Sequence, residues 1–576
     1  MRKIIFIILV VQILFSACED VLDKRDFSAV DETLWNDETR ATMYLNKLYA
    51  DNMPGMSLAG NAGYGDETFN SNDYVYGQLI ESSVGDFSLL NYRKIRDINI
   101  MLEGIENGTL ENGSRDILMG QACFLRAWRY WELVKLYGGV PLIMEAQDPF
   151  YDNLNSPRNK TSECIDAIIS DLDKGIENLP GKWIKPEDYG RITCGAAAAM
   201  KGRVLLFWAS PQFNPEYKPE RWQRAYEANA AARELLEGEG YGLVNDFSQI
   251  FLIEGYDNPE AILIRSYDDA YFPGGWESSC RPPSGGGTGS NNPTLELVNA
   301  FPMLNGKSIT DPTSGYDEIY YWRNRDPRFY ATVAYNGCEW KLNGRNAAIQ
   351  WTYYLNSQEN RRTPSTGFYC RKASNPNVHV DDVERTPTDW IEIRFAEVLL
   401  NLAECTNEIG NSTEAYDILK QIRARAGIEP GANNMYGLNE NMDKTEMREA
   451  IIRERQIELA YENKRYWDLR RHMMFANDLG PGTPKLNGTV RHGIIVRAKS
   501  PYSSSDIDAM RDTIDIETDY ETCFTVQLKN MDTQYTINYL QPKYNFFAIP
   551  QNILDRSPAV EQTMGWENGT FDPYAE

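Results

Sequence analysis

Acidic side chains are the most abundant groups in this sequence that could take part in chemistry, with 83 Asp and Glu against three His. A glycosidase needs two carboxylates that face each other about 5 to 9.5 Å apart, and so many acids always supply such pairs on paper. His379, His472 and His492 lie at no spacing typical of a triad or a metal site, and neither H-E-x-x-H nor G-x-S-x-G occurs. We therefore expect a protein that is not an enzyme, with no catalytic residue, no metal ligand set and no cofactor.

The first eighteen residues suggest a different chemistry, the attachment of lipid to a cysteine. A positively charged start precedes an apolar run from Ile4 to Phe15, which is the arrangement of an export signal. Small residues directly before Cys18 resemble a bacterial lipobox, although Phe15 stands where that motif usually has Leu. We predict that residues 1–17 are removed and that Cys18 is lipidated, since acyl chains anchor a protein by about 0.8 kcal/mol per buried methylene. The alternative is an ordinary cleaved signal.

The other eight cysteines contain no C-x-x-C pair, so they do not indicate zinc. Cysteine within an apolar helical pattern acts as a small buried hydrophobe, and this applies to Cys123, Cys164, Cys194 and Cys405. Three more lie in a loop-rich stretch of an exported chain, where a disulfide is compatible with the compartment: Cys280, Cys338 and Cys370. The sequence leaves their redox state open.

The chain is acidic overall, with 58 Lys and Arg and a net charge of -25. Such a charge repels phosphate backbones, so we exclude nucleic acid as a partner. The hydrophobic content of 42% over 576 residues allows one large core or two connected lobes. We therefore expect a globular protein with a soluble, exposed surface.

Aromatic residues are numerous, with 34 Tyr and 13 Trp, and flat rings can stack on the faces of sugars while amides and carboxylates bind the hydroxyl groups. In an extended segment alternate residues point to opposite sides, so Tyr320 and Trp322 can share one face while Tyr321 packs inward. Several aromatics stand in polar, Gly-containing loops where the local sequence offers no core. With polar neighbours at the rim, the predicted ligand-binding residues are Tyr74, Tyr76, Trp276, Asp317, Tyr320, Trp322 and Asn324.

Helical periodicity indicates the elements that must position these residues. Apolar stripes predict helices at 118–136, 196–208, 222–236, 393–403 and 415–422. Gly138 and Gly139 should end the first helix, whereas Asn411 should cap the last one and Gly427 should end it. Short strands and loops are expected between residues 265 and 390.

The two helices at 393–403 and 415–422 have small residues spaced as in a tetratricopeptide repeat (TPR), and repeats of this kind stack to bury their faces. We predict a mostly α fold, namely a TPR-like α-superhelix with a loop-rich insertion that contains short strands. The expected regions are a signal peptide at 1–17, an N-terminal helical region at 18–264, a loop-rich ligand-binding insertion at 265–390, a second helical region at 391–475, and a loop-rich C-terminal segment at 476–576 that packs on the helices.

A further helix around 447–461 is apolar nearly all round, so it should be buried on several sides. Buried charges must be paired. Arg455 and Glu458 lie at helical contact spacing, while Glu454 needs a partner from another helix.

Five sequence blocks stand out along the mature chain. They are LRAWRYWELVKLYGGVPLI at 125–143, RFAEVLLNLAEC at 394–405, IRARAGI at 422–428, RERQIELAYENKRYWDLRR at 453–471, and FAIPQNIL at 547–554 followed by QTMGW at 562–566. In this order they closely resemble segments of the SusD/RagB family. The resemblance implies a TPR-based fold, an outer-membrane location, and partnership with a SusC-like TonB-dependent transporter.

Together with the lipobox, the resemblance implies a lipid-anchored protein on the outside of the outer membrane that captures oligosaccharides and delivers them to that transporter. The RagB branch resembles this chain equally in its helices but serves peptide uptake, so a peptide ligand remains an alternative, and a non-catalytic TPR scaffold is another. Exposed stacked rings would favour a glycan, whereas charged pockets and backbone-pairing edges would favour a peptide. The sequence identifies neither the sugar nor its linkage.

Overall fold

The computed structural model describes residues 32–84, 92–148, 150–353 and 364–576. The predicted signal peptide and the predicted lipidation site Cys18 lie outside the described residues. The described residues are 42% helix and 8% strand, which confirms the predicted mostly α class. None of the described helices is long and apolar enough to cross a membrane.

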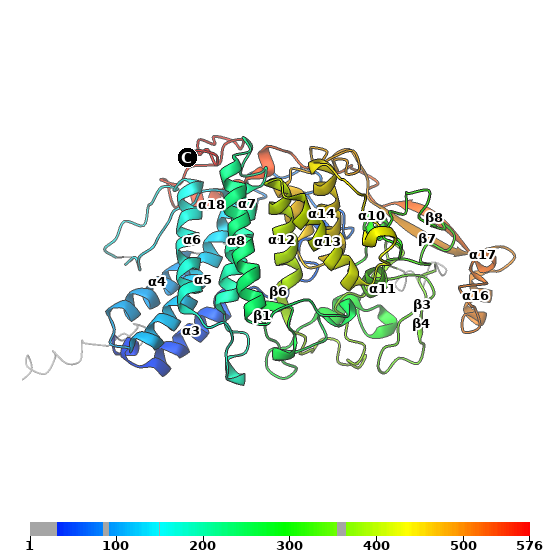
Figure 1. The fold of residues 1–576 in the computed structure, drawn as a ribbon, viewed down its shortest axis with the longest axis horizontal. Helices are drawn as coiled ribbons and strands as arrows, with labels where there is room; N and C mark the ends of the chain where they lie inside the picture. Colours follow the sequence, from blue (N-terminus) through cyan, green and yellow to red (C-terminus); the bar gives the residue numbers. More distant parts are fainter. Residues whose placement is uncertain (1–31, 85–91, 149, 354–363) are drawn as a thin grey trace, which may run out of the picture.

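The longer helices form a frame that runs along the long axis of the molecule (Figure 1). Consecutive helices pack on one another, and α8 packs on α12 although the loop-rich insertion separates them in sequence. The frame consists of α3 (Glu38–Asn52), α4 (Tyr92–Asn107), α5 (Asn112–Tyr137), α6 (Thr161–Asn178), α7 (Cys194–Ala209), α8 (Pro219–Gly238), α12 (Phe395–Glu408), α13 (Ser412–Ala426), α14 (Lys444–Glu458) and α15 (Arg465–Arg471).

Short elements make up most of the right end of the molecule in Figure 1, whereas β1 and β6 lie near its middle and α18 lies beside the frame helices. In the part of the chain that the structure describes, the strands form four antiparallel pairs, β1 with β6, β2 with β5, β3 with β4, and β7 with β8. Their bounds are β1 (Ala261–Arg265), β2 (Val333–Ala334), β3 (Cys338–Glu339), β4 (Ile349–Gln350), β5 (Tyr369–Cys370), β6 (Trp390–Arg394), β7 (His492–Ala498) and β8 (Phe524–Asn530). The short helices are α9 (Trp276–Cys280), α10 (Leu295–Ala300), α11 (Pro327–Thr332), α16 (Ser504–Met510), α17 (Tyr520–Cys523) and α18 (Gln551–Leu554).

Local sequence explains where the frame helices begin and end. Gly138 follows α5 with a φ of 74°, a conformation that glycine adopts without strain. The side chain of Asn411 accepts the backbone N–H of Glu414 and caps α13, and Gly427 ends that helix in the left-handed region. These predicted boundaries are confirmed.

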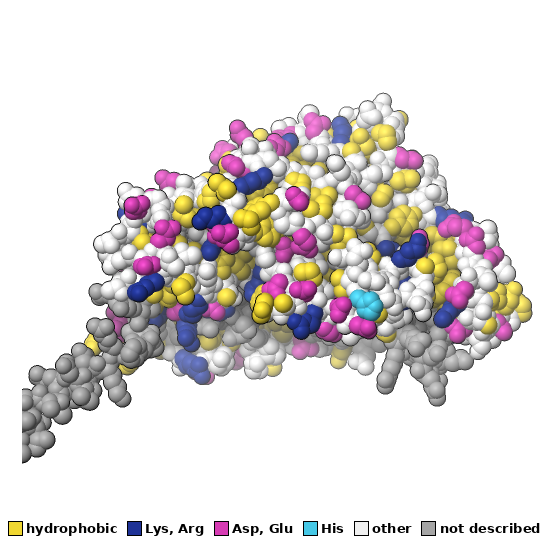
Figure 2. Space-filling model, turned by 90° about the horizontal axis from the view of Figure 1, so that it is seen from below, with side chains coloured by type: hydrophobic (Ala, Val, Ile, Leu, Met, Phe, Trp, Pro, Cys, Tyr) yellow, Lys and Arg dark blue, Asp and Glu magenta, His cyan; other side chains and the backbone are white. Residues whose placement is uncertain are grey.

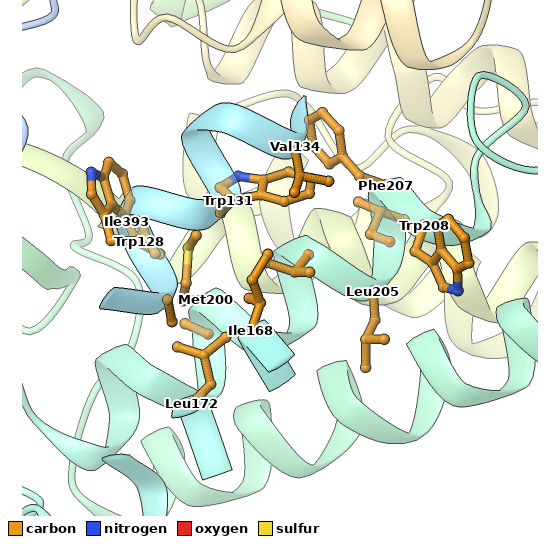
Figure 3. Close-up of a cluster of buried hydrophobic side chains, with 14 of the residues drawn as sticks. Trp128, Trp131, Val134, Ile168, Leu172, Met200, Leu205, Phe207, Trp208 and Ile393 are labelled. Atoms are coloured by element: carbon orange, nitrogen blue, oxygen red, sulfur yellow. The ribbon is translucent and has the colours of Figure 1, made fainter. Parts of the chain in front are cut away.

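The frame core contains large aromatic rings packed among aliphatic side chains (Figure 3). Trp131 of α5 and Phe207 of α7 meet edge to face, with ring centroids 5.2 Å apart. The helices α7 and α8 approach closely because Gly202 has no side chain where Asn229 lies, and Asn229 donates to its carbonyl oxygen at 3.1 Å. Burial of this interdigitated surface is the main source of helix stability here, since isolated helices of this length are marginal in water.

Buried ion pairs join the second helical region to the insertion. Glu454 lies 2.7 Å from Arg328 of α11 and 2.8 Å from Arg423 of α13, so its predicted partners from other helices are confirmed. The predicted pairing of Arg455 with Glu458 is wrong. Arg455 instead pairs with Asp468 of α15 at 2.9 Å, because α14 is enclosed on several sides and neighbouring elements supply the partners.

All eight described cysteines are buried and free, so no disulfide joins Cys280, Cys338 and Cys370. Cys280 lies in α9, while Cys338 and Cys370 belong to different strand pairs. Burial raises the pKa of the Cys370 thiol well above its usual range. These thiols therefore act as small apolar groups in the core.

Candidate functional site

The two tryptophans of the predicted ligand platform are core residues. Trp276 is 3% exposed, and its indole N–H donates to the carbonyl oxygen of Lys372 at 2.9 Å. Trp322 is 2% exposed and donates to the carboxylate of Glu517 at 2.9 Å. The expectation that these rings lack a core is wrong, because the loop-rich region has a hydrophobic cluster of its own, built from distant segments.

The other residues near Trp322 mainly stabilise the local backbone. Tyr321 packs inward as predicted, but Tyr320 shares no open face with Trp322, since the guanidinium of Arg323 lies 3.5 Å from the centroid of the Tyr320 ring. Asp317 accepts the backbone N–H groups of residues 319 and 320. Asn324 has a φ of 50°, and its carbonyl oxygen accepts a hydrogen bond from Leu304.

Tyr74 and Tyr76 belong to the other hydrophobic cluster, that of the helical frame. Tyr76 is buried and donates its hydroxyl to Asp532 at 2.6 Å, while Tyr74 is half-buried and stacks on Tyr64 at 4.9 Å between centroids. The five predicted aromatic residues therefore fall in two separate clusters, while Asp317 and Asn324 are exposed. Tyr74 and Tyr320 keep partly accessible rings.

A different set of rings lines a pocket of about 100 Å³, which we name the tyrosine pocket. Each ring is partly exposed, and the four rings are Trp183, Tyr189, Tyr241 and Tyr256. They come from two connections, one between α6 and α7 and one between α8 and β1. Both connections lie at the lower end of the frame in Figure 1 because α6 and α8 both run toward it.

Hydrogen bonds to the backbone fix the rings in the tyrosine pocket. The indole N–H of Trp183 donates to the carbonyl oxygen of Ile192 at 3.1 Å, and the hydroxyl of Tyr256 donates to that of Lys185 at 3.2 Å. Tyr189 and Tyr256 meet edge to face, with centroids 5.0 Å apart. The pocket is therefore preorganised by the two connections that form it.

Polar groups surround these rings. Lys182 lies 5.2 Å from the Tyr241 ring centroid, and Arg191 pairs with Asp188 at 2.8 Å. Burial raises the pKa of the Tyr189, Tyr241 and Tyr256 hydroxyls above the ordinary tyrosine value. These hydroxyls stay neutral at physiological pH, so each can donate and accept hydrogen bonds.

Ring faces beside hydroxyl, amide and charged groups suit a ligand that has both an apolar face and many hydroxyls, which is the chemistry of a sugar. The lower end of the molecule, seen in Figure 2, has hydrophobic side chains in several patches between acidic and basic ones. Sequence reasoning missed this pocket although Trp183 stands in a Gly- and Pro-containing loop like those singled out. The rings could not be recognised as one group from sequence, because Trp183 and Tyr256 lie far apart in the chain.

A second concave surface, the charged groove, has a volume of about 640 Å³ and no aromatic residue among those that line it. It lies between α14 and the segments around 300–311 and 431–442. Both acids and bases line it, among them Lys307, Glu446 and Arg453. Among the described residues, no three His, Cys, Asp or Glu side chains are grouped so as to hold a metal ion.

Similarity to known proteins decides the family. The model of the SusD family matches residues 256–566, which is more than half of the chain. The chain belongs to the SusD family. A second family model, described as "Starch-binding associating with outer membrane", matches residues 21–206. The SusD/RagB membership predicted from the five blocks is confirmed.

Relatives of this SusD family protein span nearly its whole length. SusD-like protein P38 of Formosa agariphila is 25% identical over 544 residues, which cover 86% of this chain and 95% of that protein. A SusD-like protein from Bacteroides fragilis is 26% identical, with a TM-score of 0.74 over 93% of this chain and 99% of that one. A laminarin-binding SusD-like protein shares the fold at 19% identity, with a TM-score of 0.55 over 92% of this chain and all of that one. The TPR-like helical architecture is thereby confirmed.

Proposed function

We propose that this protein captures oligosaccharides at the outer face of the outer membrane and delivers them to a SusC-like TonB-dependent transporter. The observation that carries this proposal is the tyrosine pocket, a ring-lined cavity in a chain of the SusD family. A family described as starch-binding and a neighbour described as laminarin-binding support the choice of a glycan. The protein acts by binding alone, without catalysis.

The physical basis is a match between the pocket and one sugar unit. Stacking on a ring removes apolar C–H surface from water at about 25 cal/mol per Å², while the hydroxyls keep hydrogen-bond partners at the rim. The charged groove offers no ring for stacking. We therefore place the sugar contact at Trp183 and Tyr256, and we retain Tyr74 and Tyr320 as further candidates because their rings are partly accessible.

Anchoring and partnership complete the proposal. Lipid attached to Cys18 would hold the protein on the extracellular side of the outer membrane, and more than one acyl chain makes such an anchor stable. The transporter partnership rests on the family resemblance of the sequence blocks.

Calorimetry with soluble starch, laminarin and a panel of peptides tests the ligand class. We expect a glycan to bind, and we expect Tyr256→Ala and Trp183→Ala each to weaken binding at least tenfold, about 1.4 kcal/mol. The matched control is Tyr271→Ala, because Tyr271 is 94% exposed and does not line the pocket. Wild-type affinity in both pocket variants would contradict this location of the site.

Peptide capture is the second candidate, and the charged groove is the observation that favours it. An extended peptide binds through charged pockets and by hydrogen bonding to the edge of a strand. One edge of β8 is paired with β7, and the peptide would bind at the other edge. If peptides bind and glycans do not, and if Arg453→Gln weakens the peptide while Tyr256→Ala does not, the peptide-uptake function replaces the glycan one.

A further inference from the structure

A second ring-lined cavity, which we name the tryptophan chamber, lies between the N-terminal and the second helical regions. Its volume is about 80 Å³, close to that of the tyrosine pocket. Three tryptophans line it, Trp128 and Trp131 on α5 and Trp467 on α15. Trp128 and Trp131 lie about one helical turn apart (Figure 3), so both rings can line one cavity.

The charged groups that line the chamber neutralise one another. Four acids and four bases line it, and each base forms an ion pair with an acid. Arg203 lies 2.7 Å from Glu397, for example, and Arg455 lies 2.9 Å from Asp468. The lining therefore attracts neither an anion nor a cation by net charge, and a neutral ligand avoids the cost of burying a further charge.

Several hydrogen-bond donors of the chamber lack an acceptor. Trp128 is 6% exposed and Trp131 is 1% exposed, and in the part of the chain that the structure describes neither indole N–H donates to a protein group. The nearly buried ammonium of Lys135 donates one described hydrogen bond, to Glu132 at 2.6 Å, although it has three donors. Enclosed donors without acceptors cost free energy, so the chamber favours a ligand with acceptor oxygens.

We propose that the tryptophan chamber is a second sugar site, which holds one neutral hexose unit. The oxygens of a hexose supply acceptors for these donors, and its C–H face packs on the ring of Trp128. The paired carboxylates keep lone pairs that accept the sugar hydroxyls. The choice of a sugar among neutral polar ligands rests on the proposed function.

Lys135 is the residue that should contribute most to this site. Its ammonium lies 4.0 Å from the centroid of the Trp467 ring and pairs with Glu132, so its position is fixed before a ligand binds. Burial lowers the pKa of Lys135 below the ordinary lysine value, because water reaches the charge poorly. A sugar oxygen would supply part of the missing solvation.

The chamber is connected to the tyrosine pocket by a chain of hydrogen bonds. Pro54 lines the chamber and is partly exposed, and in the same segment the backbone N–H of Met56 donates to the Tyr267 hydroxyl at 2.7 Å. The backbone N–H of Tyr267 donates to Asp389 at 3.0 Å, and Asp389 accepts the hydroxyl of Tyr189 in the tyrosine pocket at 2.9 Å. Few residues therefore separate the second sugar site from the first.

Calorimetry with glucose, the unit of both starch and laminarin, tests the chamber in Trp183→Ala, in which the tyrosine pocket is impaired. We expect glucose to bind this variant at one site per protein with a Kd on the order of 1 mM. Adding Lys135→Met removes the ammonium but keeps an apolar stem, so affinity should fall at least tenfold. The matched control is Lys201→Met, because Lys201 also pairs with an acid, Asp173 at 2.6 Å, but does not line the chamber. Its affinity should change less than twofold.

A second variant keeps the test decisive if Lys135→Met fails to fold. Trp128→Phe keeps an aromatic ring and removes one indole donor, so it should also weaken glucose binding in Trp183→Ala. The melting temperature of each variant shows whether the fold is retained.

The outcomes separate this proposal from the proposed function. A chamber that holds only water would leave Trp183→Ala without glucose binding, which would overturn the second site while glycan binding by the wild type still supports the function. Equal glucose affinity with Lys135→Met and with Lys201→Met would also overturn it. Loss of glucose binding through Lys135→Met but not through Trp183→Ala would support the chamber and contradict the tyrosine pocket as a sugar site. If the wild type bound neither glucose, starch nor laminarin, both proposals would be wrong.

Discussion

Glu454→Ala should destabilise the protein by about 3 kcal/mol, the low end of the 3 to 5 kcal/mol that breaking a buried ion pair typically costs. Glu454 is fully buried and neutralises two arginines. Arg328 would keep Asp326 and Glu458 as partners, whereas Arg423 would keep only carbonyl oxygens in the described structure. The predicted destabilisation therefore comes mainly from the charge of Arg423, which would lose its acidic partner. For this reason we choose the low end of the range.

Urea denaturation followed by circular dichroism measures this loss. The matched control is Glu234→Ala on α8, an exposed helical position, which should stay within about 0.5 kcal/mol of the wild type. Glu454→Gln removes the charge but keeps nearly the same side-chain volume. Its loss of stability should therefore lie between those of Glu454→Ala and Glu234→Ala. If Glu454→Ala costs less than about 1 kcal/mol, the pairing does not stabilise the native state as we argue.

The pH dependence of the same variant gives a second check. Burial opposes the charged form of Glu454, but Arg328 and Arg423 outweigh it and lower the pKa of this carboxyl. A lowered folded pKa stabilises the native state above the unfolded value of about 4.5 and loses that effect as the pH falls. The difference between the wild type and Glu454→Ala should therefore shrink in acid.

Three further predictions concern anchoring, the partner and a second buried acid. Cys18→Ala should move the protein from the outer-membrane fraction to the soluble fraction, and retention in the membrane would contradict lipidation. Pull-down after gentle solubilisation should recover a β-barrel of TonB-dependent size, and repeated recovery of this protein alone would count against delivery to a transporter. Burial raises the pKa of Glu67 to about 7, so its contribution to stability is present below about pH 4.5 and is lost as the pH rises to 7. Glu67→Gln should flatten this fall in the melting temperature, and an unchanged profile would refute the assignment.

Sequence predicted the features that depend on local chemistry. Gly138 and Asn411 bound their helices as expected, because a cap is specified by residues within one turn. The burial of α14 followed from its apolar faces, and so did the need of Glu454 for partners from other helices.

Features that depend on distant segments were not predictable in the same way. Trp322 looked exposed among polar neighbours, yet Tyr335 stacks on it with centroids 5.5 Å apart and Tyr520 packs edge to face on it at 4.4 Å. Arg455 found Asp468 rather than the residue one turn along its own helix. Only the folded chain brings such partners together, so a sequence read in local windows assigns buried rings to the surface and misses pockets assembled from two connections.

The pairing of β1 with β6 gives the loop-rich insertion the topology of a very long hairpin loop. Its two ends leave the helical frame side by side, and within this closed loop of about 125 residues Arg328 pairs with Glu454 and Glu458 of α14. Closure entropy grows slowly with length, and doubling such a loop costs only about 0.6 kcal/mol. A longer surface loop within the insertion should therefore cost little, since α8 and α12 pack together independently of it, whereas loss of α11 would remove one of the two arginines that pair with Glu454.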